Sequence, residues 1–170
     1  FRGRVTRDGL SGDRALPGRY HLYVSLACPW AHRTLIFRAL KGLDNAISVS
    51  IVDPLMLDDG WAFSEFPGCV PDTVNGARYL REVYAKADPR YSGRVTVPVL
   101  WDRETGTIVN NESSEIIRML NSEFEEFARR HEDYYPQPLR AEIDAVNRLV
   151  YENINNGVYR CGFATTQEAY

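Results

Sequence analysis

The residue of this sequence best placed for chemistry is Cys28, which is followed directly by Pro29. Residues 20–26 are rich in β-branched and aromatic side chains and predict a strand, whereas apolar residues recur at helical spacing from Pro29 to about Leu40. Cys28 would then lie in the turn before a helix, where unpaired backbone N–H groups and the helix dipole favour a thiolate. Because the thiolate is the nucleophilic form of cysteine, this setting indicates thiol chemistry, with a buried, inert cysteine as the alternative.

Ala31 occupies the position at which a dithiol oxidoreductase carries its second cysteine. A site with a single thiol cannot form an internal disulfide, so an external thiol must resolve it, and glutathione is the natural candidate. The sequence therefore argues against a thioredoxin-like protein disulfide reductase.

The remaining cysteines and the overall composition exclude several classes of protein. Cys69 and Cys161 bring the number of cysteines to three at wide spacings, which is typical neither of a secreted disulfide framework nor of a zinc site. We expect a reducing compartment, the cytoplasm by default, or an organelle if a presequence has been lost. A net charge of -3 gives no basic field for nucleic acid, and no apolar run is long enough to span a membrane. We expect no metal and no flavin.

Three other segments carry residues that could bind a ligand. Pro98 interrupts a predicted strand at 95–101, so it forms a special peptide bond or lies on a sheet edge. Glu112 and Ser113 precede a predicted helix, whose backbone N–H groups can hold a carboxylate, although a simple N-cap would explain the same residues. Trp61 lies in an aperiodic segment over 53–75, which is functional or covers a small core.

The elements around these residues predict an α/β fold. The first strand and helix are followed by a strand at 47–52, which forms a parallel βαβ unit. A helix, a pair of strands and a last helix with Ser113 or Ser114 as its N-cap complete the order βαβ-α-ββα. We expect four regions: an irregular arm over 1–19, an α/β domain over 20–122, a linker over 123–138 and the start of a helical domain over 139–170.

Five segments, taken together and in this order, carry a resemblance to a known family: Cys28-Pro29-Trp30-Ala31-His32-Arg33, Trp61, Arg94-Val95-Thr96-Val97-Pro98, Asn111-Glu112-Ser113-Ser114 and Asn155-Asn156-Gly157-Val158-Tyr159. They resemble the motifs of the glutathionyl-hydroquinone reductases, also called Xi-class glutathione transferases. The resemblance runs from about Tyr20 to Tyr170. Members of that family are longer than this chain, so we expect the sequence to be a partial chain.

The resemblance implies a thioredoxin-like domain followed by the start of an all-α glutathione-transferase C-terminal domain. It implies that Cys28 removes glutathione from glutathionyl-hydroquinones through a mixed disulfide, while Tyr159 protonates the aromatic leaving group; helix packing is the other reading of Tyr159. Pro98 would be cis, and the full-length protein would be a homodimer. Glutathione, as co-substrate, would be bound by Trp61, Arg94, Val95, Thr96, Val97, Glu112 and Ser113.

Two other functions fit the same residues. The first is an omega-like or glutaredoxin-type thiol transferase, acting on glutathione mixed disulfides or dehydroascorbate with the same Cys28 chemistry. The second is a glutathione-binding module that regulates a partner and turns over nothing. A preference for an aromatic thioether over a disulfide would distinguish the reductase from the transferase, and an unreactive Cys28 would favour the module.

Overall fold

Strand β3 (Tyr20–Ser25) lies inside a four-stranded sheet in the computed structural model, which describes residues 1–170. All six residues of β3 are buried, as expected of a strand that is covered on both faces. Strand β3 pairs in parallel with one neighbour and antiparallel with the other, and the sheet order is β4-β3-β5-β6. The other strands are β4 (Ile47–Val52), β5 (Val99–Asp102) and β6 (Thr107–Asn110).

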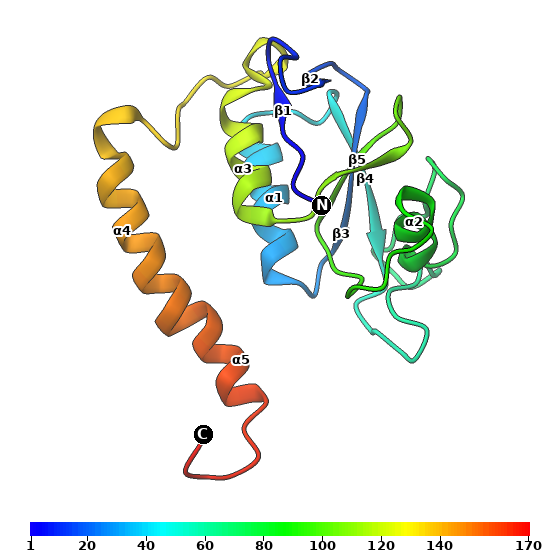
Figure 1. Ribbon diagram of the computed structural model, residues 1–170, viewed down its shortest axis with the longest axis vertical. Coiled ribbons are helices and arrows are strands. Elements are labelled where there is room, and N and C mark those ends of the chain that lie inside the picture. Colours follow the sequence, from blue (N-terminus) through cyan, green and yellow to red (C-terminus); the bar gives the residue numbers. More distant parts are fainter. The chain divides into compact units, whose positions relative to one another are not determined.

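Three helices cover the two faces of this sheet. Figure 1 shows α1 (Pro29–Leu40) and α3 (Ser113–Ser122) together on one face and α2 (Leu80–Ala87) on the other. Each helix directs a strip of apolar side chains inward, because residues three and four positions apart share a face. In α2 this strip is Leu80, Val83 and Tyr84, and in α3 it includes Ile116 and Leu120. The element order βαβ-α-ββα predicted for this domain is confirmed.

Both ends of α1 follow from local residues. Pro29 is the first helical residue, where its missing N–H group costs no hydrogen bond. At the other end Gly42 has a φ of +64°, and its N–H donates to the Ala39 carbonyl at 3.0 Å. The N–H of Leu43 reaches back to Arg38 at 2.9 Å, which completes a Schellman motif. Local residues therefore fix where α1 begins and ends, and with its start they fix the place of Cys28 directly before the helix.

The expectation of an irregular arm over 1–19 is wrong. Two short parallel strands, β1 (Val5–Thr6) and β2 (Asp13–Arg14), form a small second sheet in this region, and Val5 is fully buried. Ahead of them, the N–H of Gly3 donates to the Val109 carbonyl at 2.7 Å, at the edge of the main sheet. Strands of two residues are too short to show an alternating pattern, so the sequence carried no signal for them.

The predicted element boundaries are displaced at one strand and one helix. The strand expected from 95 begins at Val99 because Pro98 cannot donate to a sheet ladder. The N-cap of α3 is Glu112 rather than Ser113 or Ser114, and its side chain accepts a hydrogen bond from the Ser114 N–H.

The long segment between β4 and α2 is anchored by a buried carboxylate. Asp72 accepts hydrogen bonds from the N–H groups of Val74, Asn75 and Ala77 at 3.0–3.1 Å. The same carboxylate accepts the Tyr23 hydroxyl of β3 at 2.9 Å. This segment is therefore fixed to the sheet although it has no helix or long strand of its own.

The chain divides into two compact units, Phe1–Glu132 and Asp133–Tyr170. The first unit continues past the domain end expected at 122, through the 3₁₀ turn η1 (Glu125–Phe127). Buried Lys41 holds this stretch by donating to Glu125 Oε2 at 2.7 Å and to the Glu132 carbonyl at 3.1 Å.

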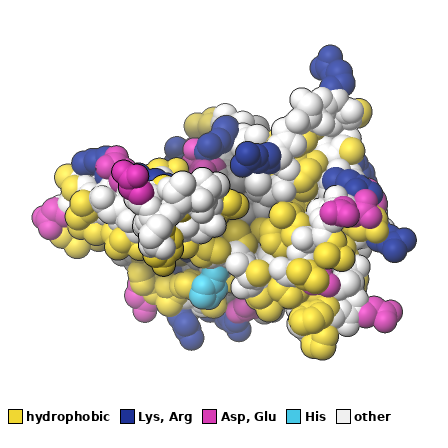
Figure 2. All heavy atoms as spheres, turned by 90° about the horizontal axis from the view of Figure 1, so that it is seen from below, with side chains coloured by type: hydrophobic (Ala, Val, Ile, Leu, Met, Phe, Trp, Pro, Cys, Tyr) yellow, Lys and Arg dark blue, Asp and Glu magenta, His cyan; other side chains and the backbone are white.

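The second unit is helical throughout most of its length. A 3₁₀ turn, η2 (Gln137–Leu139), leads into α4 (Arg140–Val150), a π-helical turn, η3 (Tyr151–Asn155), and α5 (Asn156–Gly162). No helix of the chain has both the length and the apolar character needed to cross a membrane. On the face drawn in Figure 2, charged side chains of both signs lie among hydrophobic ones.

Candidate active site

Cys28 is the N-cap of α1 and is half-buried. Its extended backbone, with φ −98° and ψ 114°, turns the chain from the end of β3 into the helix. The N–H groups of Trp30 and Ala31 lie in the first turn, where no helical carbonyl is available to them. A negative charge on the Cys28 sulfur would therefore lie at the positive end of the helix dipole.

The Cys28 thiol faces the backbone of Val97. Its Sγ donates to the Val97 carbonyl oxygen at 3.6 Å. The peptide bond between Val97 and Pro98 is cis. Val97 and Pro98 are both buried, so the backbone that the thiol contacts is shielded from solvent.

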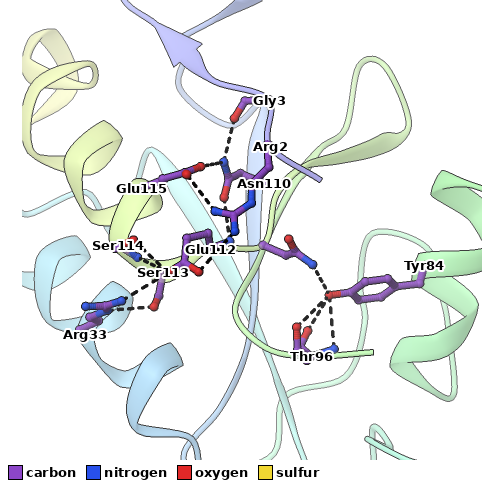
Figure 3. A network of polar contacts seen from close by, with 11 residues as sticks. Arg2, Gly3, Arg33, Tyr84, Thr96, Asn110, Glu112, Ser113, Ser114 and Glu115 are labelled. Carbon is purple, nitrogen blue, oxygen red and sulfur yellow. Dashed lines mark hydrogen bonds and ion pairs between the residues drawn. The ribbon is translucent and has the colours of Figure 1, made fainter. Parts of the chain in front are cut away.

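A polar cluster lies at the N-terminus of α3 (Figure 3). Glu112 Oε1 accepts hydrogen bonds from the N–H and the hydroxyl of Ser114, at 3.0 and 2.9 Å. Arg33 of α1 donates its Nε to the Ser113 Oγ at 2.9 Å and lies 3.5 Å from Glu112 Oε1. From the N-terminal arm, Arg2 lies 3.8 Å from Glu112 Oε2.

Two of these residues were not predicted as parts of the site. Arg33 reaches Ser113 across 80 positions of sequence, and Arg2 is 113 positions from its other carboxylate partner, Glu115. No spacing in the sequence could pair residues this far apart. The signals for Arg33 in the sequence were its place in the helix that Cys28 begins and its place at the end of the motif from Cys28 that carries the family resemblance.

The cluster combines two cations, two carboxylates and the N-terminus of a helix. Arg33, the Ser113 hydroxyl and the α3 amides can hold a carboxylate, and Glu112 can hold an ammonium group. A ligand with both groups on one carbon would satisfy both halves of the cluster. Cys28 and the cluster come from α1, its N-cap and the start of α3, and these two helices pack against each other.

The other predicted residues lie in different settings. Trp61 is half-buried and packs against the hydrophobic core, and its carbonyl accepts the Leu80 N–H at 2.9 Å. Arg94 is exposed, and its carbonyl accepts the Tyr91 hydroxyl at 2.8 Å. Tyr159 belongs to α5 of the second unit, where its ring stacks on Phe163 with centroids 6.4 Å apart. The packing of Trp61 agrees with the structural alternative, and roles for Arg94 and Tyr159 stay predictions.

A thiol at a helix N-cap beside a cis proline, on a βαβ-α-ββα framework, defines a thioredoxin-like thiol site. The model of the family described as "Glutathione S-transferase, N-terminal domain" matches residues 27–123. The chain therefore belongs to the glutathione S-transferase family.

Relatives within this family are similar over nearly the whole of this chain. The glutathionyl-hydroquinone reductase PcpF of Sphingobium chlorophenolicum is 60% identical over 96% of this chain and 53% of its own length. The glutathionyl-hydroquinone reductase YqjG of Escherichia coli K12 is 56% identical over all of this chain and 54% of its own length.

Solved structures give the same result. The glutathione-bound structure of YqjG matches with a TM-score of 0.96 at 56% identity, covering 100% of this chain and 58% of that one. The Xi glutathione transferase ECM4 of Saccharomyces cerevisiae, in complex with glutathione, matches with a TM-score of 0.93 at 44% identity, covering 100% and 59%. The present chain spans about half the length of the curated relatives it matches.

Proposed function

We propose that the protein to which this chain belongs is a glutathionyl-hydroquinone reductase with Cys28 as its nucleophile. The observation that carries the proposal is the thiol of Cys28 at the N-cap of α1, facing Val97 beside the cis proline. The names of PcpF and YqjG, both glutathionyl-hydroquinone reductases, support the choice of substrate class.

Glutathione would bind with its γ-glutamyl group at the start of α3. The carboxylate of this group would be held by Ser113 and the helix N-terminus, with Arg33 close by, and its ammonium would face Glu112. The cysteinyl part would lie along Val97, whose backbone groups can pair with an extended peptide. Trp61, Arg94, Val95 and Thr96 would complete the binding site.

The reaction would proceed in two steps. The Cys28 thiolate attacks the sulfur of the glutathionyl-hydroquinone, and the bond between that sulfur and the aromatic carbon breaks. The carbon leaves with the electron pair and takes a proton, which we assign to the Tyr159 hydroxyl. This leaves Cys28 in a disulfide with glutathione. A second glutathione thiolate attacks the disulfide, regenerates Cys28 and leaves as oxidised glutathione.

Ala31 supports a mechanism that uses external glutathione. Its methyl group is buried where a dithiol enzyme would carry a second thiol, so Cys28 has no resolving partner within its own motif. We further propose a reducing compartment such as the cytoplasm, and a homodimer as the full-length assembly.

The test is release of hydroquinone by the full-length protein. We would supply a glutathionyl-hydroquinone with excess glutathione and compare the wild type with Cys28→Ala and with Cys161→Ala, which removes an exposed thiol of the second unit. Release should be lost only in Cys28→Ala. Release that persists without Cys28 contradicts the mechanism. Reduction of a glutathione mixed disulfide without hydroquinone release would favour an omega-like transferase, and binding without turnover would favour a binding module.

A further inference from the structure

Tyr84 of α2 lies beneath the proposed glutathione site. The side chain is 1% exposed, and its ring packs against those of Phe1 and Tyr91, with centroids 5.8 and 5.0 Å away. Its hydroxyl points toward the chain that leads to Pro98 (Figure 3). A buried hydroxyl in this position must find polar partners.

The Tyr84 hydroxyl has four polar contacts, three with Thr96 and one with Asn111; its contact with the Thr96 hydroxyl is 3.4 Å long. It donates to the Thr96 carbonyl at 2.8 Å. It accepts from the Asn111 side-chain amide at 3.2 Å and from the Thr96 N–H at 3.4 Å. A phenol has one donor and two acceptor sites, and these contacts provide partners for all of them.

These partners lie next to the two halves of the proposed glutathione site. Thr96 precedes Val97, whose carbonyl faces Cys28, and Asn111 precedes Glu112, the N-cap of α3. The two segments flank the antiparallel β5–β6 hairpin, one before β5 and the other after β6. Within this group of contacts, the Tyr84 hydroxyl is the atom bonded to both segments.

We propose that Tyr84 is a positioning residue that sets the distance between the cysteinyl and γ-glutamyl halves of the glutathione site. The proposal rests on the proposed function, because it needs glutathione to span Val97 and Glu112. Tyr84 acts through its neighbours and is not assigned a contact with substrate. A site held within a fraction of an ångström binds and orients better than one whose supporting residues are free to move.

The variant Tyr84→Phe removes the hydroxyl and keeps the ring. We expect the Kd for reduced glutathione to rise about 5- to 20-fold, the effect of losing one or two buried hydrogen bonds. The KM for the glutathionyl-hydroquinone should rise by a similar factor, with a smaller effect on kcat, because binding is weakened before the chemical step. The alkylation rate of Cys28 by iodoacetamide, which needs no glutathione site, should change less than about twofold.

Tyr20→Phe is the matched control. Tyr20 is also buried, and its hydroxyl donates to a backbone carbonyl, that of Arg14, at 2.7 Å. This variant loses a buried hydroxyl of the same kind away from the site, so glutathione affinity should not change. Asn111→Ala is the second variant, since it removes the bond between Asn111 and the hydroxyl and leaves the contacts with Thr96 in place.

The experiment is calorimetric titration of the full-length variants with reduced glutathione under a phosphine reductant, together with steady-state hydroquinone release. Weaker binding in Tyr84→Phe and Asn111→Ala, with less than additive loss in the double variant, supports the proposal. Unchanged affinity in Tyr84→Phe, an equal loss in Tyr20→Phe, or unchanged affinity in Asn111→Ala overturns it. A wild type that binds glutathione but releases no hydroquinone refutes the proposed function alone. A wild type that does not bind glutathione overturns both.

Discussion

Lowering the pH should destabilise this fold through His21, a residue of the sheet remote from the thiol. The side chain is 0% exposed, and its two ring nitrogens lie 2.7 and 2.9 Å from the hydroxyls of Ser48 and Ser50. Burial, with a contribution from the nearby Arg103, lowers the pKa of His21 from its ordinary value of 6.5 to about 4. The folded protein therefore keeps this ring neutral under conditions in which the unfolded chain would protonate it.

The sign and size follow from proton linkage. Between pH 4 and 6.5 the unfolded state binds more protons at this residue, so the free energy of unfolding falls as the pH falls through that window. The loss should be about 2 kcal/mol at pH 5 and should approach about 3 kcal/mol near pH 4, at about 1.4 kcal/mol per pH unit.

The assay is urea unfolding of the wild type and of His21→Gln at several pH values from 7 to 4. The variant keeps hydrogen-bonding groups for the two serines but cannot titrate, and carboxylates that titrate at low pH are common to both proteins. The stability difference between wild type and variant should shift by about 2 kcal/mol against the wild type between pH 7 and 5. A difference that stays constant over this range would refute the assignment of a buried, neutral His21.

Two further predictions concern charged side chains of the first unit. Arg33→Met removes the donor to Ser113 Oγ at 2.9 Å. We expect the affinity for glutathione to fall about tenfold in titration calorimetry, and the free energy of unfolding in urea to fall by no more than about 1 kcal/mol. Equal affinity in the variant would show that Arg33 is not part of the site. Asp102→Asn removes the carboxylate charge that pairs with Arg19 through two hydrogen bonds, at 3.0 and 2.5 Å, inside the fold. We expect the free energy of unfolding in urea to fall by about 3–5 kcal/mol, with no change at the proposed glutathione site. A fall below about 1 kcal/mol would contradict this prediction.

Local patterns in the sequence were sufficient for the main elements of the fold. The alternation over 47–52 and the helical spacing after Pro29 are properties of short segments, and β4 and α1 form where they were predicted. The place of Cys28 at the start of a helix follows in the same way, since Pro29 and the preceding strand are its neighbours in sequence. Motif order then led to the family, which the match over 27–123 confirms.

The pairing of distant segments was decided only by the tertiary structure. Arg33 meets Ser113, Tyr84 joins Thr96 to Asn111, and Gly3 adds to the edge of β6, each through contacts that depend on the register of the sheet and the packing of helices on its faces. These contacts leave no period in the sequence, because the chain between the partners can have any length that reaches. For this reason the sequence by itself determined the place of Cys28 at the start of its helix and the family, whereas the residues that support the proposed site became visible only in the folded chain.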